Sequence, residues 1–337
     1  MRPGLTARPP FPWVGGKERL QYIIRSIFPP DPPRYVEHFG GSGSILLGLP
    51  MSLSRVEVYN DYDADLTNLF LCIRDKTLAL LRELGFLPLH AEEEFLLLLK
   101  FLRREMALPD FTESELAVAR AVLTDIQYAE VEKILRGRAA AWDVKRAAAF
   151  YTVDRRSFNS MRKTFALRPT NLRNFFGLIT AAALRLERVI ITNRDFEDSI
   201  RVHDSETTLH YCDPPYFEAE KMYAPGFPLE DHYRLHDTLR ECKGPRVISY
   251  NDCDFTRELY EDFYILHFER QNHMSQTEGA MYEELLITSY DPRPMLAQRT
   301  RQCNMFEQEG DCEKGELVLV HEPRRPIRVA MPPAEDG

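Results

Sequence analysis

Seven short runs rich in β-branched and aromatic residues are spread along the chain, and helical patterns separate most of them. They occupy residues 34–39, 55–61, 188–195, 207–213, 246–252, 263–270 and 283–290. Strands that alternate with helices are typical of a doubly wound α/β sheet, so we expect the first five to be parallel. A polar segment joins the last two, which predicts an antiparallel hairpin at an edge of the sheet.

Residues 62 to about 150 interrupt this alternation. Leucine- and alanine-rich helical patterns fill the block, and no run in it resembles a strand. We therefore predict a helical lobe inserted after the second strand, over residues 62–170. The sheet domain would comprise residues 1–61 and 171–294, and residues 295–337 would form a C-terminal tail.

Charge is unevenly distributed along the chain. The whole chain carries −9, yet residues 136–173 hold ten Lys or Arg against two Asp, a net +8. A basic stretch on an acidic body suits a protein that contacts a polyanion along one face. A solvated surface segment explains the same pattern equally well.

Cysteines, histidines and hydropathy narrow the class of protein. The six cysteines form no C-x-x-C pair, so neither a zinc site nor a disulfide framework is indicated. His232 and His236 stand four apart, but without a third ligand a solvated helix face explains them better than a metal. No apolar run reaches the roughly 20 residues of a membrane span. We expect a cytoplasmic protein with no membrane anchor and no metal.

The fourth predicted strand ends in Asp213, Pro214, Pro215 and Tyr216. Consecutive prolines cannot continue a central strand, because each lacks an N–H and has a fixed φ. Ligands of open α/β sheets bind beyond such strand ends. There the Asp213 carboxylate and the Pro214 carbonyl can accept both hydrogens of an amino group on a flat ring, and Tyr216 can stack on that ring. A proline-rich β-turn with a capping Asp is the structural alternative.

A glycine-rich turn follows the first predicted strand. Phe39 leads into Gly40, Gly41, Ser42 and Gly43, and an apolar helical pattern begins there. Small residues let the backbone approach a ligand. Asp61 ends the second strand twenty positions after Gly41, where an acidic side chain can bind a ribose diol. This pairing suits NAD as well as S-adenosylmethionine, and Asp61 could instead cap the following helix.

A second glycine turn lies near the start, in PFPWVGGKERL at residues 10–20. Lys17 stands at the head of a predicted helix, where it could hold a carboxylate with one charge. The spacing of a phosphate-binding P-loop is absent.

In this order, the PWVGGK, FGGSG, ND, NRDF, DPPY and EELLIT motifs resemble the D12 class of DNA adenine-N6 methyltransferases, the Dam-like family. The resemblance extends to about residue 291 and implies an S-adenosylmethionine-dependent methyltransferase sheet with an inserted recognition lobe. It implies that Phe39, Gly41 and Gly43 line the cofactor and that Asp61 binds its ribose. Trp13 and Lys17 would close over the methionine end of the cofactor, and Asp195 and Phe196 would hold its adenine. The target base would be held by Asp213, Pro214, Pro215 and Tyr216.

Residues 147–165 resemble the segment that leads the recognition hairpin of this family. The residues expected to contact DNA are Arg155, Arg156, Arg162 and Lys163 at phosphates and Asn159 at a base edge. Ser160 replaces the usual Gly, which leaves the target sequence open. His38 replaces the common Pro of the E-P-F motif.

We therefore predict a site-specific methyltransferase that acts on the N6 amino group of an adenine turned out of double-stranded DNA. A cognate restriction endonuclease is a candidate partner. The sequence leaves open methylation of cytosine N4, glutamine or RNA adenine, and a catalytically silent DNA-binding subunit. Nicotinamide chemistry would leave the DPPY motif unexplained.

Overall fold

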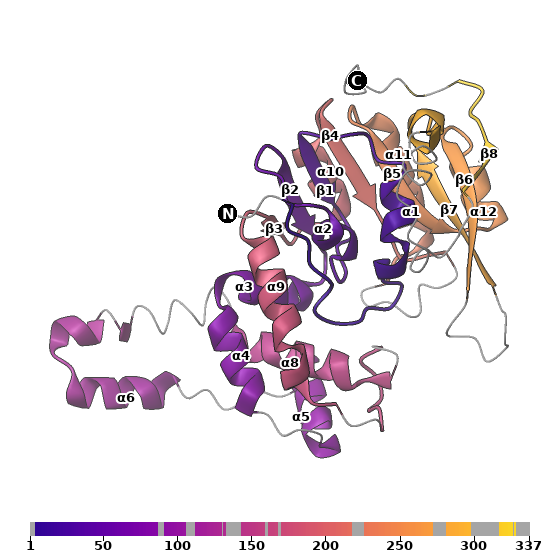
Figure 1. Ribbon diagram of the computed structural model, residues 1–337. Helices are drawn as coiled ribbons and strands as arrows, with labels where there is room; N and C mark the ends of the chain where they lie inside the picture. Colours follow the sequence, from indigo (N-terminus) through magenta and orange to yellow (C-terminus); the bar gives the residue numbers. More distant parts are fainter. Residues whose placement is uncertain are drawn as a thin grey trace. The chain divides into compact units, whose positions relative to one another are not determined.

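A computed structural model describes residues 4–86, 91–105, 112–129, 131–132, 143–158, 161–167, 170–217, 226–271, 281–297, 317–325 and 327 (Figure 1). The chain divides into two compact units. The sheet unit comprises residues 1–8, 15–63 and 188–337, and the helical unit comprises residues 9–14 and 64–187. The sequence analysis assigned residues 171–187 to the sheet domain, whereas this division groups them with the helices.

The sheet unit contains eight strands in the order β3-β2-β1-β4-β5-β7-β6-β8. They are β1 (Arg34–Glu37), β2 (Val56–Asn60), β3 (Ile190–Thr192), β4 (Thr208–Cys212), β5 (Arg246–Asn251), β6 (Tyr264–Gln271), β7 (Met281–Thr288) and β8 (Val318–His321). The first five are parallel, and β6 and β7 form the predicted antiparallel hairpin. β7 pairs with β5, and β8 from the tail pairs with β6, so β8 rather than the hairpin forms this edge.

Helices accompany the sheet in its own unit: α1 (Gln21–Arg25), α2 (Ser44–Gly48), α10 (Phe196–His203), α11 (Leu229–Glu241) and α12 (Asp254–Leu259). The central strands are buried along almost their whole length, as strands covered on both faces are. Phe196 and Ile200 of α10 and Leu235 and Leu239 of α11 pack in one core with residues of β4, β5 and β7. This packing fixes the carboxyl ends of the parallel strands at one side of the sheet.

The helical unit contains α3 (Ala64–Asp75), α4 (Thr77–Phe86), α5 (Glu92–Leu102), α6 (Thr112–Val122), α8 (Val144–Arg156) and α9 (Phe176–Leu186). α3, α4 and α5 each contact α8, and α9 contacts α3 and α4. Asp143 caps α8 by accepting a hydrogen bond from the Arg146 backbone N–H at 3.0 Å. Buried residues of α5 and α8 form a core of their own around Phe95.

Residues 9–14 belong to the helical unit although they precede the first strand. The Phe11 ring is 1% exposed and packs edge-on against Phe70 of α3 and Tyr151 of α8, with centroids 5.9 and 6.2 Å away. The Tyr151 hydroxyl donates to the Pro10 carbonyl at 2.9 Å. The N-terminal segment is therefore part of this helical core.

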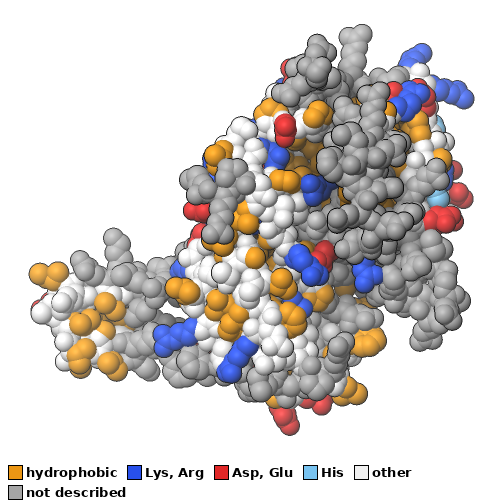
Figure 2. Space-filling view, viewed as in Figure 1, with side chains coloured by type: hydrophobic (Ala, Val, Ile, Leu, Met, Phe, Trp, Pro, Cys, Tyr) orange, Lys and Arg blue, Asp and Glu red, His pale blue; other side chains and the backbone are white. Residues whose placement is uncertain are grey.

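Side chains on α6 contrast with this buried core. Val118 and Val122 are 64% and 72% exposed, and hydrophobic side chains (orange) gather on the α6 part in Figure 2. Within the described residues, no helix combines the length and apolar character needed to cross a membrane.

Candidate active site

Asp213 follows the last residue of β4 and meets Lys17 from the N-terminal glycine turn. The Lys17 Nζ lies 2.8 Å from Asp213 Oδ1 and donates a hydrogen bond to Oδ2 at 2.9 Å. It also donates to the Gly15 carbonyl at 2.8 Å, and Lys17 is 3% exposed. A buried ammonium therefore partners this carboxylate. The resemblance had implied the methionine end of the cofactor as the place of Lys17, and the structure brings it to Asp213.

Tyr216 stands beside this ion pair on a firm support. Its ring stacks on Tyr250 of β5, with centroids 5.8 Å apart and planes 22° apart. Its hydroxyl donates to Glu284 Oε2 at 3.2 Å, and Lys17 Nζ lies 4.8 Å from the ring centroid. Pro214 is buried and Pro215 is half-buried. Asp213, Lys17 and Tyr216 therefore form one cluster at the end of β4.

Sequence reasoning missed the two residues that hold Tyr216. Glu284 is 1% exposed on β7, and Tyr250 is fully buried, with its hydroxyl bonded to His232 Nδ1. Glu284 pairs with Asn251 across the sheet, which brings it to the carboxyl end of β5. A carboxylate within the apolar run EELLIT was the available signal, because a buried Glu needs a partner.

The turn after β1 requires glycine. Gly41 and Gly43 have φ of 50° and 66°, in the left-handed region that side chains disfavour. A Cβ at Gly40 would lie 2.2 Å from the Tyr59 ring. The Tyr59 hydroxyl donates to the Gly41 carbonyl at 2.7 Å. The backbone here is tightly held, and no side chain at these glycines covers it.

Asp61 lies against this turn. Its Oδ2 accepts the Gly41 N–H at 2.9 Å, and its Oδ1 accepts the Asp63 N–H at 2.8 Å. The structure thus brings together Gly41 and Asp61, as the motif spacing predicted. The capping alternative has a basis too, since Asp63 N–H directly precedes α3. Both carboxylate oxygens of Asp61 therefore take part in holding backbone N–H groups, one in this turn and one before α3.

Asp195 and Phe196 begin α10. Asp195 Oδ1 accepts the Glu197 N–H at 2.9 Å, and both oxygens accept hydrogen bonds from Arg234 of α11 at 2.8 and 2.9 Å. The Phe196 ring stacks on Phe39, with centroids 5.6 Å apart and planes 27° apart. Phe39 follows β1 and Phe196 follows β3, and the rings of these two predicted cofactor residues are in contact. Arg234 was not predicted from the sequence.

Glu37, the last residue of β1, adds a third carboxyl group near Asp61 and Asp213. It is 2% exposed and accepts hydrogen bonds from the Leu46 N–H at 2.9 Å and the Tyr35 hydroxyl at 3.1 Å. Burial raises the pKa of Glu37 to about 8, and the nearby charges of Asp213 and Asp61 raise it further. Glu37 is therefore protonated at neutral pH, which limits the negative charge in this region.

The predicted DNA-contacting residues occupy different environments within the helical unit. Arg156 departs from the expectation, because its side chain is fully buried and donates to Glu94 Oε2 at 3.0 Å. It cannot reach a phosphate without leaving this pair. The Arg155 guanidinium lies 3.7 Å from the Phe175 ring centroid and donates to the Pro10 carbonyl. Lys163 is exposed, and Asn159 lies outside the described residues.

Arg162 forms a second contact with aromatic rings. Its guanidinium lies 4.6 Å from the Phe150 centroid and 5.0 Å from the Trp13 centroid, and its φ is 52°. Trp13 itself stacks on Phe150 at 6.4 Å. Trp13 was expected over the cofactor, and within its own unit it packs beneath Arg162.

Two groups of metal-ligating side chains lie close together among the described residues. They are Asp204 with His210 and Cys242, and Asp252 with His267 and Glu283. In the first group Asp204 already accepts the backbone N–H of Lys243, and in the second Asp252 accepts two hydrogen bonds from Arg257 at 2.6 Å. The carboxylates of Asp204 and Asp252 are therefore already engaged by N–H groups of the protein itself.

Comparisons with known proteins bear on the whole chain. Residues 13–274 match the family described as D12 class N6 adenine-specific DNA methyltransferase. A DNA adenine methylase of Haemophilus influenzae is 24% identical over 302 residues, which cover 82% of this chain and 91% of that protein. A crystal structure of protein LPL1258 from Legionella pneumophila has 11% identity, covering 60% of this chain and 84% of its own, at a TM-score of 0.27 that is too low to support a shared fold.

The family match spans most of the chain and includes both glycine turns and the DPPY motif. It favours adenine in DNA over cytosine N4, RNA adenine and glutamine, and an enzyme over a silent binding subunit. The chain belongs to the D12 class of N6 adenine-specific DNA methyltransferases.

Proposed function

We propose that the chain transfers a methyl group from S-adenosylmethionine to the N6 amino group of an adenine turned out of double-stranded DNA. The observation that carries this proposal is the contact of Lys17 Nζ with Asp213. A nitrogen that donates hydrogen bonds already lies against the carboxylate and 4.8 Å from the Tyr216 ring centroid. An adenine amino group in this position would make the same two contacts.

The turn after β1 fits the methyl donor. S-adenosylmethionine supplies an electrophilic methyl group on a positively charged sulfur. The bare backbone at Gly41 and Gly43 permits close approach, and the Asp61 carboxylate beside this backbone suits ribose hydroxyls. The half-buried ring of Phe39, stacked on the buried Phe196, offers an apolar surface for the donor's adenine, near the capping Asp195.

The residues at the end of β4 prepare the target nitrogen. The amino lone pair of adenine is delocalised into the ring and is a poor nucleophile. Asp213 and the Pro214 carbonyl would accept its two N–H bonds and draw the lone pair out of the ring plane. Asp213 then accepts the proton that the methylated nitrogen sheds. Lys17, which keeps its bond to the Gly15 carbonyl, yields its place to the base.

A base in a duplex must leave the stack before its amino group can reach a strand end, at a cost of a few kcal/mol. Arg155, Arg162 and Lys163 are the proposed phosphate contacts, and Asn159 is the proposed base contact. Arg156 is left out of this set, because its buried pair with Glu94 gives it a structural role. Tyr216, supported by Tyr250, would stack on the extruded ring.

An Asp213→Asn substitution tests the proposal with little change in shape. We expect methyl transfer to fall by roughly a thousandfold or more, because the amide can accept only through one oxygen and takes no proton. The affinity for S-adenosylmethionine should stay within about twofold. Transfer is measured with tritium-labelled donor and unmethylated duplex DNA, and donor affinity by calorimetry.

Asp291→Asn is the matched control. The Asp291 carboxylate is partly exposed, and among the contacts described it pairs only with neighbouring Arg293. It should leave both quantities unchanged. An Asp213→Asn enzyme that methylates DNA at the parent rate would refute the assignment of Asp213. A parent protein that binds DNA but transfers no label from S-adenosylmethionine would refute the choice of donor.

A further inference from the structure

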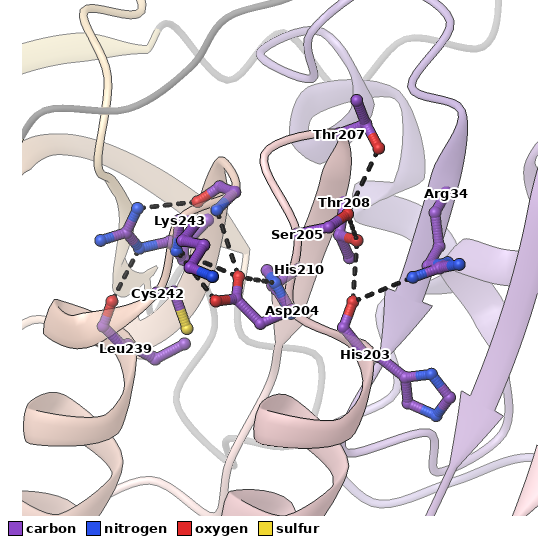
Figure 3. A network of polar contacts seen from close by, with 12 residues as sticks. Arg34, His203, Asp204, Ser205, Thr207, Thr208, His210, Leu239, Cys242 and Lys243 are labelled. Atoms are coloured by element: carbon purple, nitrogen blue, oxygen red, sulfur yellow. Dashed lines mark hydrogen bonds and ion pairs between the residues drawn. The ribbon is translucent and has the colours of Figure 1, made fainter.

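Hydrogen bonds join four side chains of the sheet unit in a series, from Ser199 through His38 and His210 to Asp204. The Ser199 Oγ is 2.9 Å from His38 Nδ1, and His38 Nε2 is 2.9 Å from His210 Nδ1. His210 Nε2 is 3.2 Å from Asp204 Oδ1, a contact shown in Figure 3. Asp204 in turn accepts the backbone N–H groups of Lys243 and Gly244. The series connects α10, β1, β4 and the turn before β5.

Three members of this series are shielded from water, and Asp204 at its end is half-buried. Ser199 and His210 are fully buried, and His38 is 1% exposed. Burial lowers the pKa of both histidines, that of His38 well below its usual value, so both rings are neutral at neutral pH. The charged groups that face them are Asp204, Arg34 and Arg246, together with the titratable ring of His203.

The direction of the hydrogen bonds follows from the ends of the series. Hydrogen bonds from His210 and two amides lower the pKa of Asp204 to about 2, so its carboxylate only accepts. His210 must then carry its proton on Nε2 and accept on Nδ1. His38 must likewise donate from Nε2 and accept on Nδ1, which leaves the Ser199 hydroxyl as the donor. One arrangement of protons satisfies all four groups.

The two residues of the His38–Ser199 hydrogen bond each lie close in sequence to a residue proposed to contact the methyl donor. His38 is bonded covalently to Phe39, and Ser199 lies one helical turn after Phe196 on α10. The Phe39 and Phe196 rings stack with centroids 5.6 Å apart. The His38–Ser199 bond therefore joins the backbone segments that carry the two stacked rings.

We propose that His38, held by His210, is a positioning residue that sets Phe39 against Phe196 for binding of the methyl donor. This inference rests on the proposed function, because it assumes that the stacked rings contact S-adenosylmethionine. His38 stands where the resembling motif commonly has Pro. His210 on β4 supplies the partner that a proline would not need.

Substitutions at both ends of the bond test this role. Ser199→Ala removes only the hydroxyl, and His38→Phe removes both ring nitrogens at similar volume. We expect each to raise the dissociation constant and the KM for S-adenosylmethionine by roughly tenfold, with kcat within about twofold, because a buried hydrogen bond is lost outside the reacting atoms. His38→Gln retains one donor and one acceptor and should restore part of the affinity.

Ser289→Ala is the matched control. Ser289 is 2% exposed and its hydroxyl accepts the Arg246 N–H at 3.1 Å, at the amino-terminal end of β5. This variant loses one buried hydrogen bond of the same unit, and its donor affinity should be that of the parent. Equal losses in Ser199→Ala and Ser289→Ala would mean that the effect is general destabilisation, and the proposal would fail.

The proton arrangement is tested separately in the protein without donor. Long-range ¹H–¹⁵N correlation spectra should show both His38 and His210 protonated on Nε2 at neutral pH. A proton on Nδ1 of either ring would overturn the series as derived. If the parent binds S-adenosylmethionine and methylates DNA while the Ser199 and His38 variants bind it equally well, this inference fails and the proposed function stands. If the parent does not bind it, the proposed function fails first.

Discussion

The two units each bury an ionisable side chain, and these two side chains differ in whether they have hydrogen-bond partners. In the sheet unit, Arg246 is fully buried and donates to the carbonyls of Leu239, Gly244 and Arg240 at 2.7, 2.7 and 3.3 Å. In the helical unit, Asp154 of α8 is 1% exposed, and neither of its oxygens has a hydrogen-bond partner in the described part of the chain. The buried guanidinium of Arg246 therefore has its partners, whereas the buried carboxyl group of Asp154 has none among the described residues.

Asp154 shows what this difference means physically. Burial raises its pKa to about 8, against the lowering effect of the Arg162 and Arg155 charges. At neutral pH Asp154 is mostly protonated, so its carboxyl group does not neutralise the positive charges of Arg155 and Arg162.

Arg246→Met tests how far the buried guanidinium stabilises the sheet unit, and we expect it to have the largest effect on the free energy of unfolding. It removes three hydrogen bonds to backbone carbonyl groups, two of them buried, and we expect a loss of about 3 kcal/mol in the free energy of unfolding. Hydrogen exchange of the β4 and β5 amides, followed by mass spectrometry, measures the loss in this unit. A change below about 1 kcal/mol would mean that water replaces the guanidinium.

Asp154→Asn tests whether the buried carboxyl group destabilises the helical unit, and we expect this substitution to raise the free energy of unfolding. The folded pKa of about 8 exceeds the ordinary value of 3.8, so the folded state holds a proton that the unfolded state has lost between these pH values. The stability of the parent therefore falls as the pH rises through this window. We expect the advantage of Asp154→Asn over the parent to grow steadily as the pH rises from about 4 towards 8, and to vanish below about pH 4.

Urea denaturation at a series of pH values measures this difference. The exposed Asp125 on the same unit provides the control, since Asp125→Asn should not alter the pH profile. A parallel pair of profiles for the parent and Asp154→Asn would show that the carboxyl group is compensated after all.

Tyr216→Phe should have the smallest effect on stability. The stack on Tyr250 remains, and the hydroxyl bond to Glu284 is lost. We expect a loss of about 1 kcal/mol in stability and a several-fold fall in methyl transfer, because the ring becomes less firmly held. A fall as large as that of Asp213→Asn would indicate that the hydroxyl takes part in the reaction itself.

The alternation of strands and helices was enough to predict the parallel sheet and its hairpin, because periodicity reports which side of an element is buried. The approach of Gly41 to Asp61 was also predictable, since adjacent parallel strands end side by side. The pairing of Lys17 with Asp213 was not, because 196 residues separate them. No local pattern encodes a contact of that range.

The basic segment shows a second limit. Arg155 and Arg156 are neighbours of identical type, yet helical geometry turns Arg156 inward to Glu94 while Arg155 is half-buried. A count of charges treats them alike. Strand β8 escaped notice for a related reason, because its four residues, only partly buried, carry too little pattern to stand out.

The placement of residues 9–14 bears on how such enzymes exchange parts. Phe11 lies in the core of the helical unit, while the residues on both sides of its segment belong to the sheet unit. A graft of residues 64–187 alone onto a related scaffold would leave Phe70 and Tyr151 without this aromatic neighbour. A hybrid that keeps the packing of Phe11 would need two pairs of crossovers, one around residues 9–14 and one around residues 64–187.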